Sequence, residues 1–200
     1  MRRLIRYGVI ITAGLLASAA CSSSSPSSSS ASGGVAGASG TLVIDNENGA
    51  LWTCGFSPFN PTDTLVSVGF VYEPLVYVNP LQNGATTPML GSSWTWGAGN
   101  MSLVFNIRQG VKFTDGTPLT AADVAYTFNL IKKYPALDLT GVWSVLSSVT
   151  QTGPYQVTMK FSTAAVPWFY YIADQTPIVP EHIWSKISNP VAYPDSHPVG

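Results

Sequence analysis

Residues 111–133 read VKFTDGTPLTAADVAYTFNLIKK, and this stretch constrains the fold more than any other part of the chain. The tetrapeptide DGTP at 115–118 is rich in turn formers, because glycine accepts positive φ, proline fixes its own φ, and an aspartate side chain can bond the backbone just ahead. Thr120 precedes Asp123 by three residues, which is the spacing of a capping box. We therefore expect the chain to reverse at 115–118 and a helix to begin at Thr120.

The predicted helix carries an apolar stripe that needs a partner. Five apolar residues recur at helical spacing behind the cap: Ala121, Val124, Ala125, Phe128 and Ile131. Upstream, Leu103, Phe105 and Ile107 alternate with other residues at the period of a half-buried strand. The sequence thus predicts a module of strand, turn and capped helix, in which we expect the stripe to pack against this strand.

The rest of the chain favours short strands and few long helices. Strand-like runs lie at 41–45, 76–78, 144–150 and 155–161, and the last two are joined by a hairpin signal at 151–154. Short helices are expected at 64–71, at 165–173 and after Pro180, and a turn-rich connector at 79–88. This pattern predicts an α+β (mixed α/β) fold.

The first forty residues carry the features of an export signal and a linker. Arg2, Arg3 and Arg6 form a basic segment, and the apolar run that follows ends in small residues, the layout of a secretory signal peptide. That run is too short to span a bilayer, which takes about 20 apolar residues. We therefore assign 1–20 to a signal peptide, 21–40 to a Ser/Gly-rich tether and 41–200 to the folded domain.

Cys21 stands directly after the signal. A signal ending in small residues, then a cysteine and a low-complexity tether, resembles a bacterial lipoprotein, in which Cys21 would carry the lipid and anchor the protein to the membrane. Ser18 departs from that pattern, since lipoproteins usually have leucine three residues before the cysteine. Ordinary cleavage after Ala17-Ser18-Ala19, which would release a free exported protein, is the alternative.

The cysteines and the charge exclude two classes of protein. Besides Cys21 there is only Cys54, so no disulfide framework is expected; Cys54 is either a buried apolar residue or pairs beyond residue 200. Removal of the three leader arginines leaves six basic against ten acidic residues, a net charge of about −4. Nucleic-acid binding, which needs a basic face, is therefore not expected.

No catalytic or metal-binding motif is present. The sequence lacks G-x-S-x-G, H-E-x-x-H, a P-loop and paired C-x-x-C, and His182 and His197 are not at ligand spacing. His182 is expected to be a surface or capping residue, and Asp115 and Asp123 are expected to serve the turn and the cap. We predict neither catalytic nor metal-ligating residues, no cofactor and no enzyme activity.

Two of the six tryptophans are candidates for ligand contact. Trp52 and Trp143 lie in segments of weak periodicity, where an aromatic ring can line a cleft rather than fill a core.

Several motifs follow one another in the order typical of one family. YEPLVYVNP, TPMLGSSWTW, LVFNIRQGVKFTDGTPLTAADVAYTFN, VTMKF, IVPEHIW and PVG resemble landmarks of the family 5 extracytoplasmic solute-binding proteins, the peptide- and oligosaccharide-binding components of ABC importers. The resemblance runs from about residue 41 to residue 200. Family members are several hundred residues long and usually continue after P-V-G with Thr-Gly-Pro-Tyr. The resemblance therefore implies an N-terminal fragment.

For the fold, the resemblance implies the type II two-lobed architecture of periplasmic binding proteins, of which this chain would supply the N-terminal part of lobe 1 and its attached subdomain. Lobes of this kind close around the ligand like a hinge. The module at 111–133 would be scaffold. The ligand wall would include Thr64, Leu65, Val66 and Ser67, and the loop 139–143 with Trp143, beside the candidate Trp52.

For function, the resemblance implies a monomeric, lipid-anchored receptor that captures peptides outside the membrane and hands them to the permease subunits of an importer. Peptide relatives offer backbone groups to an extended ligand, whereas sugar-binding relatives stack tryptophan on the rings. An oligosaccharide receptor, or a sensing or surface binding protein without a transporter, is the alternative.

Overall fold

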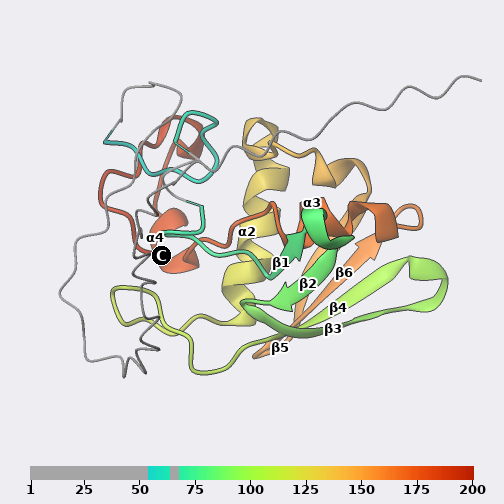
Figure 1. The fold of residues 1–200 in the computed structure, drawn as a ribbon. Helices are drawn as coiled ribbons and strands as arrows, with labels where there is room; N and C mark the ends of the chain where they lie inside the picture. The colour runs from blue at the N-terminus through green and yellow to red at the C-terminus, as the bar shows by residue number, and fades with distance from the viewer. Residues whose placement is uncertain (1–53, 64–67) are drawn as a thin grey trace, which may run out of the picture. The chain divides into compact units, whose positions relative to one another are not determined.

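The computed structural model describes residues 54–63 and 68–200 (Figure 1). The chain divides into two units, 1–45 and 46–200, and all described residues belong to the second. The strand expected at 41–45 lies outside the described residues. Within them, no helix is long and apolar enough to cross a membrane.

A four-stranded antiparallel sheet forms the centre of the described part. Its strands are β3 (Gly91–Trp96), β4 (Ser102–Ile107), β5 (Leu146–Gly153) and β6 (Gln156–Phe161), in the order β3-β4-β6-β5. The predicted hairpin between the last two strands is confirmed. Its turn is Pro154-Tyr155, later than most of the signal at 151–154, because β5 continues to Gly153 past an irregularity in register between Gln151 and Gly153.

One face of the sheet is apolar and covered. Leu103, Phe105 and Ile107 are buried, as their alternation predicts. The stripe of α2 (Ala121–Lys133) is buried as well, but the helix packs on β5 and β6 rather than chiefly on β4. Phe169 of α3 (Phe169–Ala173) stacks on Phe105. The helix α3 therefore lies on the same side of the sheet as α2 (Figure 1).

The start of α2 has the predicted capping box. The hydroxyl of Thr120 accepts a hydrogen bond from the Ala122 N–H (3.2 Å), and the carboxylate of Asp123 accepts one from the Thr120 N–H (2.8 Å). Two N–H groups that an isolated helix would leave unpaired are thereby satisfied. The turn before the helix is confirmed too, with Gly116 at φ 86°.

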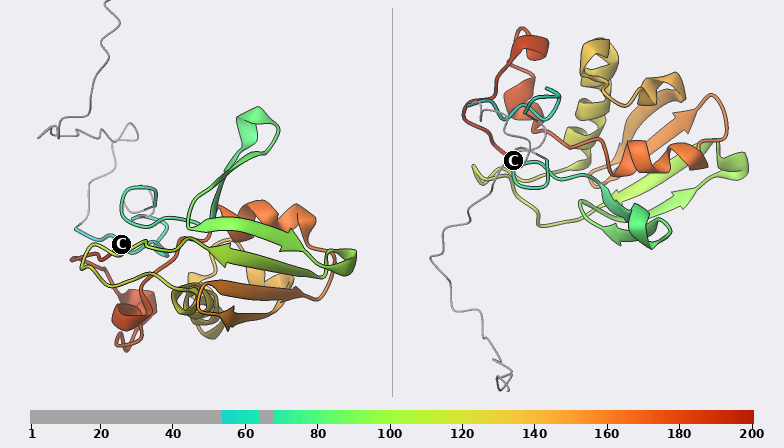
Figure 2. Two further views of the ribbon diagram at one scale, coloured as in Figure 1. Left: turned by 90° about the horizontal axis from the view of Figure 1, so that it is seen from below. Right: turned by 45° about the horizontal axis from the view of Figure 1, so that its top comes forward.

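A second, two-stranded sheet extends from the main one. It pairs β1 (Val76–Asn79) with β2 (Ala85–Pro88) through a one-turn 3-10 helix, Pro80–Gln82. The left view of Figure 2 shows this hairpin projecting from the four-stranded sheet. The expectation that 79–88 is only a connector is wrong for its second half, because Asn83 and Gly84 at positive φ return the chain as a strand.

The remaining elements are short. They comprise α4 (Glu181–Trp184) and the 3-10 helices Ala98–Asn100, Pro135–Leu137, Val142–Ser144, Val166–Trp168 and Pro190–Ala192. The helices expected at 165–173 and after Pro180 are confirmed. The prediction of a helix at 64–71 is wrong for residues 68–71. They form a turn, which is closed by a hydrogen bond from the Gly69 N–H to the Tyr72 carbonyl oxygen (2.8 Å). Residues 64–67 lie outside the described residues. Cys54 is exposed, so the expectation of burial is wrong.

Candidate functional site

The structure describes only part of the expected ligand wall. Cys21, Trp52 and the segment Thr64, Leu65, Val66 and Ser67 lie outside the described residues. Trp143 and the rest of the loop 139–143 are described, as is the loop 56–63 that leads into the segment. The geometry of the candidate site rests on these two loops.

The loop 139–143, which follows α2, is held by hydrogen bonds to the side chain of one aspartate. Asp138 accepts hydrogen bonds from the backbone N–H groups of Val142 and Trp143, both at 3.0 Å. Gly141, at φ 70°, provides the left-handed residue that lets the chain turn back over Asp138. The loop is therefore held in one shape without any contact to a ligand.

Trp143 is tied to the helix it follows. Its indole N–H donates to the carbonyl oxygen of Phe128 (2.8 Å), and the ammonium nitrogen of Lys132 lies 4.3 Å from the ring centroid. The ring is half-buried. A ligand would meet this tryptophan through its ring surface, since its one polar donor is already engaged.

The two loops meet at a shallow depression. Pro58 and Phe59 line it from one loop, and Leu139 and Thr140 from the other. The rest of the lining comes from Ile131, Leu137, Asp138 and residues 175–177. The enclosed volume of the depression is about 20 Å³, room for about one water molecule. The structure thus brings the beginning of the loop 139–143 beside the residues just before the Asn60-Pro61 step, while Trp143 does not line the depression.

The loop that enters the 64–67 segment is also rigid. The side-chain oxygen of Asn60 accepts from the backbone N–H of Thr62 (3.1 Å) and from its hydroxyl (2.9 Å), and the Asn60 amide donates to the buried Asp63 carboxylate (2.8 Å). This Asx turn holds residues 60–63 together through their own side chains. The N-P-T-D run signals such a turn in the sequence, but not what it packs against.

The described lining offers little charge to a ligand. Asp138 is the one acidic residue in it, and both its oxygens are engaged by the backbone. Throughout residues 54–63 and 68–200, no group of three His, Cys, Asp or Glu side chains could hold a metal ion. Apolar edges, hydroxyls and an amide suit recognition by shape and by neutral hydrogen bonds.

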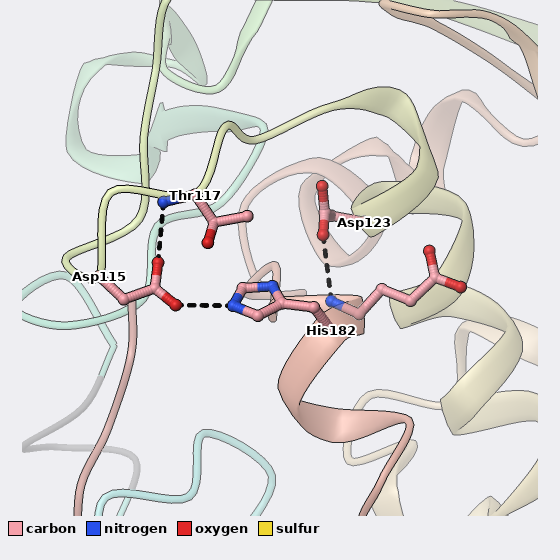
Figure 3. A network of polar contacts seen from close by, with 5 residues as sticks. Asp115, Thr117, Asp123 and His182 are labelled. Carbon is pink, nitrogen blue, oxygen red and sulfur yellow. Dashed lines mark hydrogen bonds and ion pairs between the residues drawn. The ribbon is translucent and has the colours of Figure 1, made fainter.

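Asp115 and Asp123 both have structural partners (Figure 3). Asp115 accepts from the Thr117 N–H (2.9 Å) in the turn, as predicted, and its second oxygen lies 2.7 Å from the His182 ring nitrogen Nε2. Asp123 caps α2 and also accepts from the backbone N–H of Glu181 (3.0 Å). The two carboxylates therefore join the turn and α2 to α4, which places His182 in a surface ion pair.

The Asp115 contacts predict a pH dependence. The Thr117 N–H, and after it His182, hold the pKa of the Asp115 carboxyl below its ordinary value of 3.8. A carboxyl with a lowered pKa contributes stability above the unfolded value and loses it as the pH falls through the folded one. We expect Asp115→Asn to lower the melting temperature at pH 5–7, and the gap to wild type to shrink below about pH 3.8. Melting curves from pH 2 to 7, with Glu181→Gln as a charge-matched control, test this; a gap that is constant with pH would contradict it.

A buried polar contact borders the undescribed segment. The hydroxyl of Tyr72 donates to the carboxylate of Asp195, and both residues are almost fully buried. Burial raises the pKa of both groups. This contact joins the turn after residue 67 to a segment 123 residues later, and nothing in the local sequence around Asp195 indicates it.

Comparison with known proteins agrees with this architecture. The family model described as "Bacterial extracellular solute-binding proteins, family 5 Middle" matches residues 85–200. Over 91 residues the chain is 33% identical to the oligopeptide-binding protein AppA of Bacillus subtilis (strain 168), covering 44% of this chain and 17% of AppA. Over 117 residues it is 27% identical to the nickel-binding periplasmic protein of Escherichia coli (strain K12), covering 54% of this chain and 22% of that protein.

Two solved structures carry the fold comparison. A periplasmic oligopeptide-binding protein of an ABC transporter from Thermotoga maritima, with mannohexaose bound, superposes with a TM-score of 0.68 at 32% identity, over 76% of this chain and 29% of its own. AppA in complex with a nonapeptide superposes with a TM-score of 0.56 at 25% identity, over 64% of this chain and 25% of its own.

The chain belongs to family 5 of the bacterial extracellular solute-binding proteins, which are the binding components of ABC importers, and its fold is part of the type II periplasmic-binding-protein fold. Proteins of this family act outside the cytoplasm. The chain spans about a fifth of the length of the curated relatives described above.

Proposed function

We propose that this chain is part of a receptor that binds peptides outside the membrane and delivers them to the permease subunits of an ABC importer. The observation that carries the proposal is the family match over residues 85–200, together with the likeness to AppA, whose structure holds a nonapeptide. The relatives are substrate-binding proteins, and we accordingly propose no enzymatic activity.

The described wall supports peptide binding. Its loops are stiffened by their own hydrogen bonds, and its lining has no free charged group to demand a particular side chain. An extended peptide that pairs with the backbone of the 64–67 segment would be bound whatever its sequence, since main-chain hydrogen bonds do not depend on side chains. Thr64, Leu65, Val66 and Ser67 are the residues proposed for this role.

An oligosaccharide receptor is the second candidate. The Thermotoga maritima relative was solved with mannohexaose, at 32% identity to this chain. Trp143 presents a half-buried ring beside the wall, and Trp52 is the other tryptophan proposed to contact a ligand. Aromatic rings of this kind suit the apolar faces of sugars.

Replacement of Trp143 distinguishes the two candidates. We would measure the shift in melting temperature that a mixed nonapeptide library and mannohexaose cause in the protein encoded by the complete reading frame, and repeat this with Trp143→Leu. The indole of Trp143 also donates a hydrogen bond to the Phe128 carbonyl, so its replacement lowers the melting temperature without ligand. For this reason we compare the shift that each ligand causes in the variant with the shift in wild type. Trp168→Leu is the control for the loss of a tryptophan elsewhere. A peptide shift that survives Trp143→Leu supports the peptide receptor, and a mannohexaose shift that is lost supports the sugar receptor. No shift with either ligand would contradict both.

We further propose the domain layout expected from the sequence: a signal peptide at 1–20, a tether at 21–40, and residues 41–200 as the N-terminal part of a two-lobed binding domain whose second lobe follows residue 200. We propose that the receptor acts as a monomer. The lipid on Cys21 would hold it on the outer face of the cell membrane.

The anchor is tested by Cys21→Ser. A serine has no thiol for the lipid, so we expect the variant to move from the membrane fraction to the medium or periplasm. Mass spectrometry of the mature N-terminus shows whether wild type carries the lipid. Wild-type protein that is cleaved after Ala19 and carries no lipid would contradict the anchor, and would show that the signal with Ser18 is not processed as a lipoprotein signal.

A further inference from the structure

The face of the four-stranded sheet that α2 and α3 do not cover is polar and lacks acidic groups. None of β3, β4, β5 and β6 contains Asp or Glu, and Lys160 is their one charged residue. The register aligns Thr95, Val104, Thr158 and Thr150 in one row across the strands, and Ser93, Asn106 and Gln156 in the next. We call these two rows, with Thr152, the polar sheet face.

Hydrogen bonds run across this face from one edge strand to the other. Asn106 donates to the Ser93 hydroxyl (2.9 Å), Gln156 donates to the Asn106 side-chain oxygen (3.2 Å), and the Thr152 hydroxyl donates to the Gln156 side-chain oxygen (3.2 Å). Each amide nitrogen has two N–H bonds and uses one of them within this chain of contacts. The face therefore presents pre-oriented amide donors and acceptors to solvent.

A depression of about 640 Å³ lies at one end of the polar sheet face. Asn106, Arg108 and Gln109 line it from the end of β4, and Tyr155 and Gln156 from the β5–β6 turn. A hydrogen bond from the Ile107 N–H to the Tyr155 carbonyl oxygen (2.8 Å) joins the two sides. A second, from the Ala121 N–H to the Pro154 carbonyl oxygen (3.1 Å), holds the β5–β6 turn in place. The shape of the depression is therefore set by backbone hydrogen bonds.

Arg108 brings a positive charge that no carboxylate of residues 54–63 and 68–200 neutralises. Its guanidinium donates to the backbone carbonyls of Met89 (2.9 Å) and Pro88 (3.1 Å), which fix its position. The one ion pair among the described residues is that of His182 with Asp115, so Arg108 has no acidic partner there. A fixed guanidinium with N–H groups to spare binds a carboxylate well.

We propose that the polar sheet face and its depression bind an acidic polysaccharide, a chain of neutral hydroxyl-bearing rings with carboxylates. Sugar hydroxyls donate and accept at once, as the amides of Asn106 and Gln156 do. A ring carboxylate would lie on Arg108, and a ring face on Tyr155. β6 spans roughly 13 Å from Gln156, which lines the depression with Arg108, to Lys160, at about 3.3 Å per residue. Arg108 and Lys160 therefore lie far enough apart to fit a chain of sugars rather than one.

This site is separate from the proposed ligand wall. None of its lining residues belongs to the loops 56–63 and 139–143. The receptor would bind its transported ligand at the proposed ligand wall, and would bind a glycan of the cell envelope at the polar sheet face.

Titration calorimetry with matched polymers tests the proposal. We would titrate the intact chain with an oligogalacturonate and with its methyl ester, which has the same rings and hydroxyls without the charge. We expect the acid form to bind, more weakly as salt is added, and the ester to bind at least about tenfold less tightly. Equal affinity for both forms, or binding of neither, would overturn the proposal.

Variants that add a negative charge locate the site without replacing Arg108, whose loss would also leave two backbone carbonyls without their hydrogen-bond donor. Gln109→Glu and Gln156→Glu each add a carboxylate to an exposed position beside Arg108. We expect each to weaken oligogalacturonate binding by about tenfold or more through like-charge repulsion, while Gln82→Glu, on the distant hairpin tip, leaves it unchanged. Binding that Gln156→Glu and Gln82→Glu alter equally would also overturn the proposal, as would binding to the complete protein that an excess of peptide ligand abolishes.

Discussion

Phe128→Ala is expected to lower the free energy of unfolding by about 3–5 kcal/mol. Phe128 lies in the middle of α2 and has no exposed surface, so its removal both loses a large apolar contact and leaves a cavity between the helix and the sheet. Domains of ordinary size are stable by about 5–15 kcal/mol, so this single change removes a large share of the total.

Urea denaturation measures this loss, and Phe70→Ala is the matched control. Phe70 is 58% exposed, and its replacement is expected to cost less than about 0.5 kcal/mol. Neither variant should change which ligand the complete protein binds, because Phe128 belongs to the scaffold module. A loss below about 1 kcal/mol for Phe128→Ala would contradict the packing of α2 on the sheet, since even Ile→Val in a core costs about that much.

Ligand binding is expected to stabilise the complete protein but not the 200-residue chain. A ligand that binds only the folded state at a hundredfold excess over its dissociation constant raises the free energy of unfolding by about 2.7 kcal/mol. At the proposed ligand wall, the described residues of the chain offer two short loops and a depression of about 20 Å³, which is too small to bury a peptide. In the proposed layout, the second lobe supplies the missing contacts.

The comparison needs both proteins under one set of conditions. Melting curves of the 200-residue chain and of the product of the complete reading frame are recorded with and without the nonapeptide library. We expect a shift in the longer protein only. Tight, saturable binding of peptide by the 200-residue chain would contradict the proposal that a second lobe is needed for ligand binding.

The local parts of the fold could be read from the sequence. The capping box of Thr120 and Asp123 and the turn at 115–118 depend on residues within four positions of one another, and all are present in the structure. The alternation of Leu103, Phe105 and Ile107 likewise reports one buried face. Short-range geometry determines these features, so a short stretch of sequence suffices to predict them.

Contacts between distant segments could not be read in this way. His182 meets Asp115 across 67 residues, and the Glu181 N–H meets Asp123 across 58. Both carboxylates were predicted for local roles, and each has a second oxygen that only the tertiary fold supplies with a partner. The strand order β3-β4-β6-β5, which places α2 over the last two strands, is set by the same long-range packing.

The candidate site was predictable only in outline. The family resemblance implied the loop 139–143, and the structure places its first residues beside Pro58 and Phe59. The sequence did not indicate that the Trp143 N–H is engaged by Phe128, because periodicity says nothing of where an indole donor points. The polar sheet face was missed because threonine, serine and amide residues on a strand signal only its exposed side.

Amide hydrogen exchange of the complete protein, with and without bound peptide, tests the central proposal most directly. If this chain supplies a wall that pairs with an extended peptide, bound peptide should slow exchange at residues 58–67 and 139–143 and leave the turn and helix at 115–133 unchanged. Slower exchange confined to 115–133, or no change in residues 58–67, would contradict the proposal that these loops form the peptide site.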